Sequence, residues 1–420
     1  MPGVERTGPP APPLLTRRRR RILYLHQHYS RPDGSTGTRS FLHAGALTEA
    51  GHGVTLACGR YAGARSGLGG PFRLGARRGA PDGFDVVEFD IPCGNAQRLP
   101  ARASAFLRFA ARAAALALRG EWDLVVASST PLTVAIPALL ARRLRGVPFV
   151  FEIRDPWPEM PRALAPGRIP APVLGALDRL ANAACREAAA TVALTEGMAR
   201  TAIAHGADPA RVHVLPQGAD LDLFGPLAAP WRPDCAAPDE LLAVYAGAHG
   251  PANGLDQLLD AAALLRGAGV RLLLVGEGAR KAALVARAKA EHLPVCFLDP
   301  LPKPRIAQLL AGADVALLCL ADVPALGELS APNKLAEGLA AGLPIVANVP
   351  GRAARLLEDG RCGLAVPPGD APALAAALRR LAQDPRARHA MGRAARELAE
   401  ARLDARRIAR DFVGLVEMVA

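Results

Sequence analysis

A lysine and a glutamate stand three positions apart in the apolar stretch "SAPNKLAEGLAAGLPIVAN", residues 330–348. On a helix, Lys334 and Glu337 would share one face. A lysine ammonium can neutralise a phosphate. A carboxylate can accept two hydroxyl hydrogen bonds at once, as the vicinal diol of a ribose would donate. The pair therefore favours a nucleotide ligand, and the alternative is a surface ion pair worth roughly 0.2–0.5 kcal/mol.

The residues around this pair predict a short helix over residues 333–341. Pro332 suits its first turn, and either Ser330 or Asn333 can cap it. Gly342 ends it. Because the apolar strand "DVALLCL" comes before it, we expect the amino end of the helix to open on the edge of a sheet. Free N–H groups and the helix dipole favour a phosphate there.

A second candidate segment lies near the start of the chain, "DGSTGTRSF" at residues 33–41. Gly37 lets the backbone approach a substrate closely, and Thr38 can cap the following helix. Arg39 would begin that helix, where the dipole disfavours a cation unless an anion binds beside it. We expect this segment to bind an anion. A tight strand-to-helix turn would explain the glycines but not Arg39.

Charged residues also follow a buried strand in "FVFEIRDPWPEMP", residues 149–161. Glu152, Arg154 and Asp155 come where the strand ends. In open parallel sheets this edge borders the ligand crevice. We predict that Asp155 orients or deprotonates an acceptor hydroxyl, and that Arg154 supports it or binds a phosphate.

The elements that must position these residues repeat one pattern in both halves of the chain. Short apolar runs alternate with helical stretches, which predicts parallel sheets covered on both faces. The first half has "RILYLHQHY", "GVTLACG", "FDVVEFD", "DLVVASS", "VPFVFEI", "ATVALTE" and "RVHVLPQG". The second has "LLAVYAG", "VRLLLVGEG", "PVCFLDP", "DVALLCL", "LPIVANV" and "GLAVPPG". The fold class is therefore α/β, with two doubly wound, Rossmann-like domains facing each other across a cleft.

The segment between the halves is dense in Pro, Gly and Asp over residues 217–240. A chain of 420 residues exceeds what one core usually supports, which also favours two domains. We expect a disordered basic tail, a first Rossmann-like domain, a linker, a second Rossmann-like domain, and a last helix that packs back on the first domain. The expected boundaries are 1–20, 21–225, 226–240, 241–400 and 401–420.

Composition narrows the class of protein. The net charge is +12, and four arginines end the Pro-rich tail, which lacks the apolar core of a signal peptide. No run of about 18 apolar residues could span a membrane. The seven cysteines form no C-x-x-C pair, which indicates neither a zinc site nor a disulfide framework and fits a reducing cytoplasm.

The motifs together resemble the family 4 glycosyltransferases, retaining enzymes of the GT-B fold. "PNKLAEGLAAGLPIVAN" is similar to the donor-binding signature of that family. The similarity continues in "STGTRSFLHAGALTEAGHGVTLACG", "FEIRDPWPE", "VLPQGADLDLF", "VYAGAHGPANGLDQLLDAAALL", "LLLVGEGARKAAL" and "GLAVPPGDAPALAAAL". Within the family, the chain most resembles bacterial enzymes that add N-acetylated fucosamine or glucosamine to surface polysaccharide intermediates.

The resemblance implies that the first domain lies on the acceptor side and that the second binds the nucleotide sugar. It also implies that the segment with Gly37, Thr38 and Arg39 approaches the donor diphosphate and the acceptor. It implies that Glu337 holds the donor ribose and that the departing phosphate takes the acceptor proton on the same face of the sugar. It implies no cofactor; Asp220 and Asp222 form a D-x-D in the linker, so we expect no required metal. We also expect donor contacts from strand ends and turns of the second half, at Gly247, His249, Gly276, Glu277, Leu301 and Asn333.

The chain departs from the family pattern at two places. The usual E-x7-E spacing puts a first glutamate at Leu329, and Glu328 is one position away. Whether Glu328 replaces it is open. The family arginine and lysine after the first strand of the second domain correspond here to Ala248 and Asn253.

A diphosphate leaving group still needs positive charge to stabilise it. The candidates are Lys281, Lys334 and His249, of which we favour the two lysines as catalytic. Lys281 follows the glycine turn of "VGEG", which starts it near the cleft. The alternative is a solvated helix lysine.

A basic helix is predicted over residues 98–119, with four arginines on one side and no acid. Such a helix can bind anionic lipid headgroups beside a lipid-linked acceptor. A helix that merely covers the sheet, with its arginines in water, is the alternative. The C-terminal stretch mixes basic and acidic residues, so we expect no nucleic-acid partner.

We therefore expect a retaining, metal-independent hexosyltransferase of polysaccharide biosynthesis. It would move an N-acetylated hexosamine from a nucleotide sugar to a lipid-linked or glycan acceptor. We expect the nucleotide to be UDP. It would act in the cytoplasm or as a peripheral protein on the inner face of the plasma membrane. The alternatives are a nucleotide-sugar epimerase on the same fold and a degenerate nucleotide-sugar-binding subunit. A dinucleotide oxidoreductase is disfavoured because no G-x-G-x-x-G follows the first strand.

Overall fold

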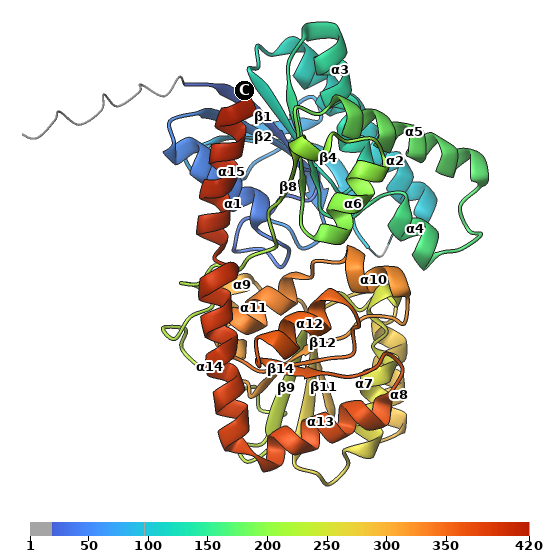
Figure 1. The fold of residues 1–420 in the computed structure, drawn as a ribbon, viewed down its shortest axis with the longest axis vertical. Helices are drawn as coiled ribbons and strands as arrows, with labels where there is room; N and C mark the ends of the chain where they lie inside the picture. The colour runs from blue at the N-terminus through green and yellow to red at the C-terminus, as the bar shows by residue number, and fades with distance from the viewer. Residues whose placement is uncertain (1–18, 96, 420) are drawn as a thin grey trace, which may run out of the picture.

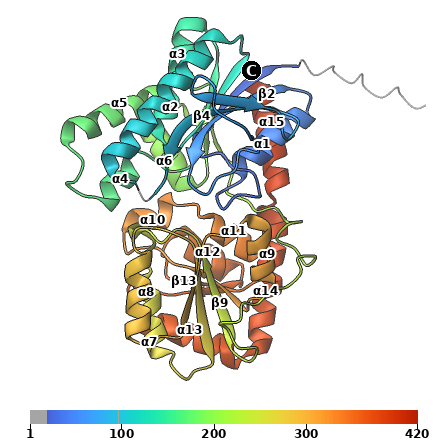
Figure 2. The same ribbon diagram turned by 180° about the vertical axis from the view of Figure 1, so that it is seen from behind.

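The computed structural model describes residues 19–95 and 97–419. The predicted basic tail over residues 1–20 lies outside the described residues, apart from Arg19 and Arg20. Two α/β domains lie one above the other in Figure 1, and Figure 2 shows the same arrangement from behind. The predicted fold class, two Rossmann-like domains with parallel sheets, is confirmed.

The N-terminal domain is built on an eight-stranded sheet with the order β3-β4-β2-β1-β5-β6-β7-β8. Its strands are β1 (Arg21–Leu25), β2 (Gly53–Tyr61), β3 (Ala76–Gly79), β4 (Asp85–Cys93), β5 (Leu124–Ser128), β6 (Phe149–Ile153), β7 (Ala190–Ala193) and β8 (Val212–Val214). Its helices are α1 (Arg39–Glu49), α2 (Leu99–Arg119), η1 (Leu132–Val134), α3 (Ala135–Arg145), α4 (Glu159–Leu164), α5 (Ala171–Glu187), α6 (Glu196–Ala204) and η2 (Pro209–Arg211). The seven strands predicted for this half are present, and the edge strand β3, which pairs antiparallel with β4, was not predicted.

The C-terminal domain has a six-stranded parallel sheet with the order β11-β10-β9-β12-β13-β14. Its strands are β9 (Leu241–Ala246), β10 (Val270–Val275), β11 (Val295–Leu298), β12 (Val315–Leu318), β13 (Ile345–Ala347) and β14 (Gly363–Ala365). Its helices are η3 (Pro251–Asn253), α7 (Asp256–Leu264), α8 (Lys281–Ala290), α9 (Lys303–Ala311), α10 (Pro324–Leu329), α11 (Asn333–Ala340), α12 (Arg352–Asp359), α13 (Ala371–Gln383) and α14 (Pro385–Arg402).

Burial explains why both sheets read as continuous apolar runs. Side chains from alternate positions of β1 enter two different cores, Leu23 and Leu25 one, and Ile22 and Tyr24 the other. The strands of the second sheet divide between two cores in the same way. Each parallel sheet is therefore buried on both faces, and its polar residues are left to the strand ends.

The chain crosses between the domains twice, and the two crossings lie side by side. Ala219 pairs with Asp404 in a parallel bridge. After the second crossing, helix α15 (Ala405–Val419) packs along α1 of the N-terminal domain (Figure 1), and Phe412 stacks on His43 at 4.1 Å. None of the described helices is long and apolar enough to cross a membrane.

The linker is held against the C-terminal domain. Phe224 and Ala236 belong to its hydrophobic core. Cys235 forms a disulfide with Cys296 of β11, 61 residues further along the chain. The sequence indicated no disulfide framework, because the spacing of two cysteines does not reveal that a linker returns to the edge of a sheet.

Candidate active site in the cleft between the domains

A cavity of about 450 Å³ separates the carboxyl ends of the two sheets. Its wall takes residues from both domains. The N-terminal domain contributes His26, His28, Ser35, Thr36, Gly37, Tyr61, Ala62, Asn95, Thr130, Arg154 and Asp155. The C-terminal domain contributes Ala246, Gly247, Ala248, Asn253, Val275, Gly276, Glu277, Pro300, Leu301, Lys303, Ile306, Pro332, Asn333, Lys334 and Glu337.

Helix α11 presents the charged pair that the sequence singled out. It runs from Asn333 to Ala340 and is followed by Gly342 in the left-handed region, with φ +70°. Neither Ser330 nor Asn333 caps it through a side chain, since Pro332 is the capping residue. The amino end of α11 therefore keeps free N–H groups beside the cavity.

Lys334 reaches across to the end of β9. Its ammonium donates hydrogen bonds to the hydroxyl of Tyr245 at 2.9 Å and to Oδ1 of Asn253 at 3.0 Å. Removal of this ammonium from water lowers the pKa of Lys334 to about 8. The group is thus a cation at neutral pH that has few partners and can gain from an anion in the cavity.

Glu337 also lies on the cavity wall, but a second lysine holds it. Its Oε1 accepts a hydrogen bond from the ammonium of Lys303, and both residues are buried. Lys303 is the first residue of α9 and lines the same cavity. No sequence pattern had selected Lys303, although its position was informative: like Arg39, it is a cation at the start of a helix.

Two glycines let the strand ends and α11 approach one another. A Cβ at Gly247 would lie 2.9 Å from Cε of Lys334. Gly276 has φ +149° and faces the carbonyl of Gly247, where a side chain would collide. The cavity wall also includes Glu277 and Leu301, two of the residues predicted to contact the donor.

Two residues predicted to bind the diphosphate do not line the cavity. The ammonium of Lys281 is held outside it by Asp299 at 2.5 Å and by Glu277 at 3.5 Å. His249 is fully buried behind the turn that contains Gly276, and burial lowers its pKa to about 4. Lys281 is thus a rim residue in an ion-pair cluster, and His249 is a neutral packing residue.

On the acceptor side, Gly37 lies where the two domains approach each other. A Cβ there would lie 2.9 Å from Nδ2 of Asn333 and 3.4 Å from a guanidinium nitrogen of Arg154. Side chains from both domains therefore crowd the position of Gly37. The neighbouring Thr38 precedes α1 without a side-chain cap and lines a smaller cavity next to Glu337.

Arg154 and Asp155 enter the cavity from the end of β6. A guanidinium nitrogen of Arg154 donates to Nε2 of His26 at 2.9 Å, which leaves Nδ1 of His26 to donate to Ser40 at 2.7 Å. Burial and the charge of Arg154 lower the pKa of His26, so it is neutral. Asp155 accepts a hydrogen bond from Thr130 at 2.6 Å and is exposed to the cavity.

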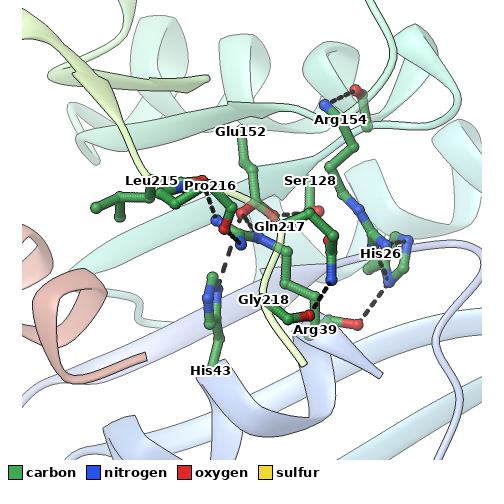
Figure 3. A network of polar contacts seen from close by, with 12 residues as sticks. His26, Arg39, His43, Ser128, Glu152, Arg154, Leu215, Pro216, Gln217 and Gly218 are labelled. Atoms are coloured by element: carbon green, nitrogen blue, oxygen red, sulfur yellow. Dashed lines mark hydrogen bonds and ion pairs between the residues drawn. The ribbon is translucent and has the colours of Figure 1, made fainter. Parts of the chain in front are cut away.

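Arg39 is the main correction to the predicted site. Its guanidinium donates to Glu152 at 2.7 Å and to the carbonyls of Pro216 and Leu215 at 2.7 and 3.0 Å (Figure 3). The side chain is buried among these acceptors and is not free for a donor phosphate. Arg39 instead fastens the end of β6 to the chain where it leaves for the second domain.

Glu152 completes this network. Its other oxygen accepts hydrogen bonds from Ser128 at 2.6 Å and Tyr24 at 3.3 Å. Burial alone would raise the pKa of Glu152, but the charge of Arg39 and the hydrogen bond from Ser128 lower it below its usual range. Glu152 is therefore a buried carboxylate that stays ionised, next to the acceptor side of the cavity.

Sequence reasoning missed the two histidines after β1. His26 and His28 both line the cavity, and burial together with Arg154 and Arg102 lowers the pKa of His28 to about 3. The signal was present, because "HQH" follows a strand whose carboxyl end faces the cleft. Both rings are neutral at physiological pH.

Glu328 does not occupy the place of the missing first glutamate. It pairs with Arg355 at 2.9 Å and Arg200 at 3.4 Å and is absent from the cavity wall, while Leu329 packs against the hydrophobic core. Among the residues that the structure describes, no group of three or more His, Cys, Asp or Glu side chains could hold a metal ion. Asp222 pairs with Arg406 at 2.7 Å.

Known proteins share both halves of this architecture. Residues 36–218 match the family described as "Glycosyl transferase 4-like domain", and residues 240–384 match "Glycosyl transferases group 1". A D-inositol 3-phosphate glycosyltransferase of Kribbella flavida is 32% identical over 72% of this chain and 73% of that protein. The Mycobacterium avium protein of the same name is 33% identical over 71% of this chain and 70% of its own length.

Solved structures share the fold at lower identity. Sucrose-phosphate synthase from Thermosynechococcus elongatus has a TM-score of 0.73 at 19% identity, with 95% of this chain and 99% of that chain covered. Anabaena HepE in complex with UDP-glucose has a TM-score of 0.66 at 20% identity, with 96% and 100% covered. With these matches over both domains, the chain belongs to the group 1 glycosyltransferases, enzymes of the GT-B fold that use nucleotide-sugar donors.

Proposed function

We propose that this glycosyltransferase moves an N-acetylated hexosamine from a UDP-linked donor to a hydroxyl of a lipid-linked or polysaccharide-intermediate acceptor, with retention and without a metal ion. The observation that carries the proposal is the arrangement of α11 across the cavity from β6. Lys334 and Glu337 face Arg154 and Asp155 over a space of about 450 Å³. A nucleotide sugar fits between a donor side with cations and an acceptor side with one carboxylate.

On the donor side, Glu337 would accept the ribose hydroxyls and the amino end of α11 with Lys334 would bind the diphosphate. Helix N-termini bind phosphates through free N–H groups, and Lys334 adds a full charge. The charge that develops on the leaving diphosphate is thereby stabilised in a site with little water.

On the acceptor side, Asp155 would orient the attacking hydroxyl while Thr130 holds the carboxylate in place. The bond between the anomeric carbon and the phosphate oxygen breaks, and the bond to the acceptor oxygen forms on the same face. The proton of the acceptor hydroxyl passes to the departing phosphate. Asp155 and the leaving group thus share the work of activating the acceptor.

Helix α2 supports a lipid-linked acceptor. Leu99 and Leu107 are 60% and 59% exposed, and Arg98 and Arg108 are exposed beside them. The inner face of the helix packs behind the cavity wall, because the ring of Phe106 lies 6.2 Å from the ring of His28, which lines the cavity. We propose that this surface contacts a membrane and brings the acceptor headgroup to the cleft.

A small phosphorylated polyol is a second candidate acceptor. The relatives from Kribbella flavida and Mycobacterium avium are named for D-inositol 3-phosphate. Arg154 supplies a cation on the acceptor side, and the neutral ring of His28 adds a hydrogen-bonding group without charge. Such a site suits a compact anion with several hydroxyls.

The test is nucleotide release from UDP-, GDP- and dTDP-sugars, each with a polyprenyl diphosphate-linked sugar or an inositol monophosphate as acceptor and with EDTA present. We expect UDP to be released from one UDP-N-acetylhexosamine, and only when the lipid-linked acceptor is present. The coupling constant of the anomeric proton, measured by NMR, should match that of the donor. Donor epimerised without acceptor would favour the epimerase, and binding without turnover would favour a degenerate subunit.

A further inference from the structure

Lys303 is a buried cation in the donor site that the proposed function does not use. The sequence has four lysines among its 51 Lys and Arg residues, at positions 281, 289, 303 and 334. Of these, Lys303 and Lys334 line the cavity. The other basic residues of the chain are arginines. The two cavity lysines thus place compact ammonium groups where the broad guanidinium fork of arginine is a poor substitute.

The position of Lys303 is unfavourable without a partner. It is the first residue of α9, which follows Pro302, and no acidic residue stands in the first turn of that helix. The dipole of a helix disfavours a cation at its amino end. Lys303 is also 8% exposed, so its ammonium has little contact with water. Its carboxylate partner, Glu337, is therefore what allows the charge to lie there.

The main chain of Lys303 fixes this lysine independently of its side chain. Its N–H donates to the carbonyls of Pro32 at 3.2 Å and Gly34 at 3.3 Å, both in the N-terminal domain. The start of α9 is thus tied to the opposite wall of the cleft through backbone atoms. A substitution at position 303 leaves these bonds available and removes only the link to Glu337.

The contact decides how Glu337 can meet a ligand. The ammonium occupies Oε1, whereas the remaining acceptor positions of the carboxylate stay open to the cavity that Glu337 lines. The ion pair with Lys303 fixes the direction of the carboxylate, so that its remaining lone pairs can accept hydrogen bonds from both hydroxyls of a diol. Without this contact, a carboxylate that is 7% exposed would lose the partner that fixes its orientation.

We propose that Lys303 is a positioning residue, which orients the Glu337 carboxylate so that it recognises the ribose diol of the donor. This inference rests on the proposed function, in which Glu337 binds the ribose of a UDP-linked sugar. Lys303 would act through Glu337 and not by touching the phosphates, because its ammonium is already committed to the carboxylate.

The test is calorimetric titration with UDP and with 2′,3′-dideoxy-UDP, which lacks both ribose hydroxyls. The ratio of the two dissociation constants measures diol recognition alone. The wild type should prefer UDP by about 10- to 100-fold, since hydroxyl–carboxylate bonds are charge-assisted. Lys303→Met should lower the ratio to below about 3-fold, as should Glu337→Gln. Lys303→Arg should restore part of it.

Matched controls separate positioning from folding. Lys289→Met, at an exposed lysine of α8, should keep the wild-type ratio. The double variant Lys303→Met with Glu337→Gln should show the same ratio as Glu337→Gln alone, because both substitutions disrupt the same interaction. If Lys303→Met fails to fold, Lys303→Gln keeps a hydrogen-bond donor without the charge and should lower the ratio in the same direction.

The outcomes that overturn the proposal are distinct. If Lys303→Met weakens UDP and dideoxy-UDP equally, the ratio is unchanged and Lys303 contacts the phosphates or only stabilises the fold. If the wild type binds UDP without preferring it over the dideoxy analogue, Glu337 does not read the diol. If the wild type does not bind UDP, the proposed function fails, and this inference fails with it.

Discussion

The ammonium of Lys334 lies 3.0 Å from Oδ1 of Asn253, at a position where the chain has lost a cation of its family pattern. By its resemblance to the family 4 pattern, Asn253 stands in the place of a lysine and Ala248 in the place of an arginine. In this protein the charge comes instead from α11, and Asn253 with Tyr245 holds it beside the strand end. The loop thus supplies a polar partner, and the positive charge comes from the facing helix.

This arrangement makes donor binding depend on pH. Because the pKa of Lys334 is lowered to about 8, the lysine loses its charge as the pH rises through that value. The phosphates of UDP are ionised above pH 7. The affinity for UDP should therefore be full near pH 7 and fall by up to about 10-fold by pH 9, as measured by calorimetry.

Lys334→Arg is the control for this titration. An arginine stays charged throughout the range, so the variant should bind UDP with an affinity that does not change between pH 7 and pH 9. Unfolding cannot mimic the effect, because a lysine whose pKa is lowered on folding makes the unliganded protein more stable as the pH rises from 8. An equal decline in both proteins would contradict the assignment.

The acceptor role of Asp155 predicts a separation of binding from turnover. Asp155→Asn keeps the hydrogen bond to Thr130 but removes the negative charge that orients the acceptor hydroxyl. We expect kcat to fall by roughly 10²- to 10⁴-fold while the dissociation constant of UDP changes less than about twofold. Steady-state kinetics and calorimetry on the same preparation decide it, and a loss of UDP binding would refute the role.

The buried pair of Arg39 and Glu152 should stabilise the fold. Glu152→Gln leaves the guanidinium buried without its counter-charge, and we expect the free energy of unfolding to fall by about 3–5 kcal/mol. Denaturant titration measures it. The matched control is Glu121→Gln, which breaks an exposed pair with Arg21 and should cost at most about 1 kcal/mol.

The same pair predicts the direction of acid sensitivity. Since the pKa of Glu152 is lowered in the folded protein, its contribution is present above the unfolded value of about 4.3 and is lost as the pH falls below it. Stability should decline on acidification more steeply in the wild type than in Glu152→Gln. If the free energy of unfolding of both proteins fell equally on acidification, the pair of Arg39 and Glu152 would not be the cause of the acid sensitivity.

Glu328 should be dispensable for donor binding. Its carboxylate pairs with Arg355 and Arg200 outside the cavity wall. Glu328→Ala should therefore leave the affinity for the UDP-sugar within about twofold of the wild type and change the stability by at most about 1 kcal/mol. A strong loss of affinity for the sugar, with UDP itself still bound, would restore Glu328 to the site.

The sheets could be predicted because parallel strands that are buried on both faces are continuous apolar runs in the sequence. All thirteen apolar runs singled out as strands form strands, whereas β3 escaped because "ARRG" is a polar edge segment without a buried face. Short helix α11 could also be placed, since Gly342 supplies the left-handed residue that ends it. Local chemistry was sufficient for these elements.

The partners of charged residues were harder to predict, because a sequence shows a charge but not its counter-charge. Arg39 and Lys303 carry the same signal, a cation that begins a helix. For Arg39 the anion is Glu152, 113 residues away, and for Lys303 it is Glu337, 34 residues away. Only the fold reveals that the first pair is a structural anchor and the second lies in the donor site.

The most direct test of the account is a calorimetric titration of UDP into the wild type and into Glu337→Ala, with Glu328→Ala as the control. The account predicts binding by the wild type and by the control, and a loss of affinity of at least about 10-fold in Glu337→Ala. Equal affinity in all three proteins would contradict the claim that α11 holds the nucleotide, and the donor site would have to be sought elsewhere on the cavity wall.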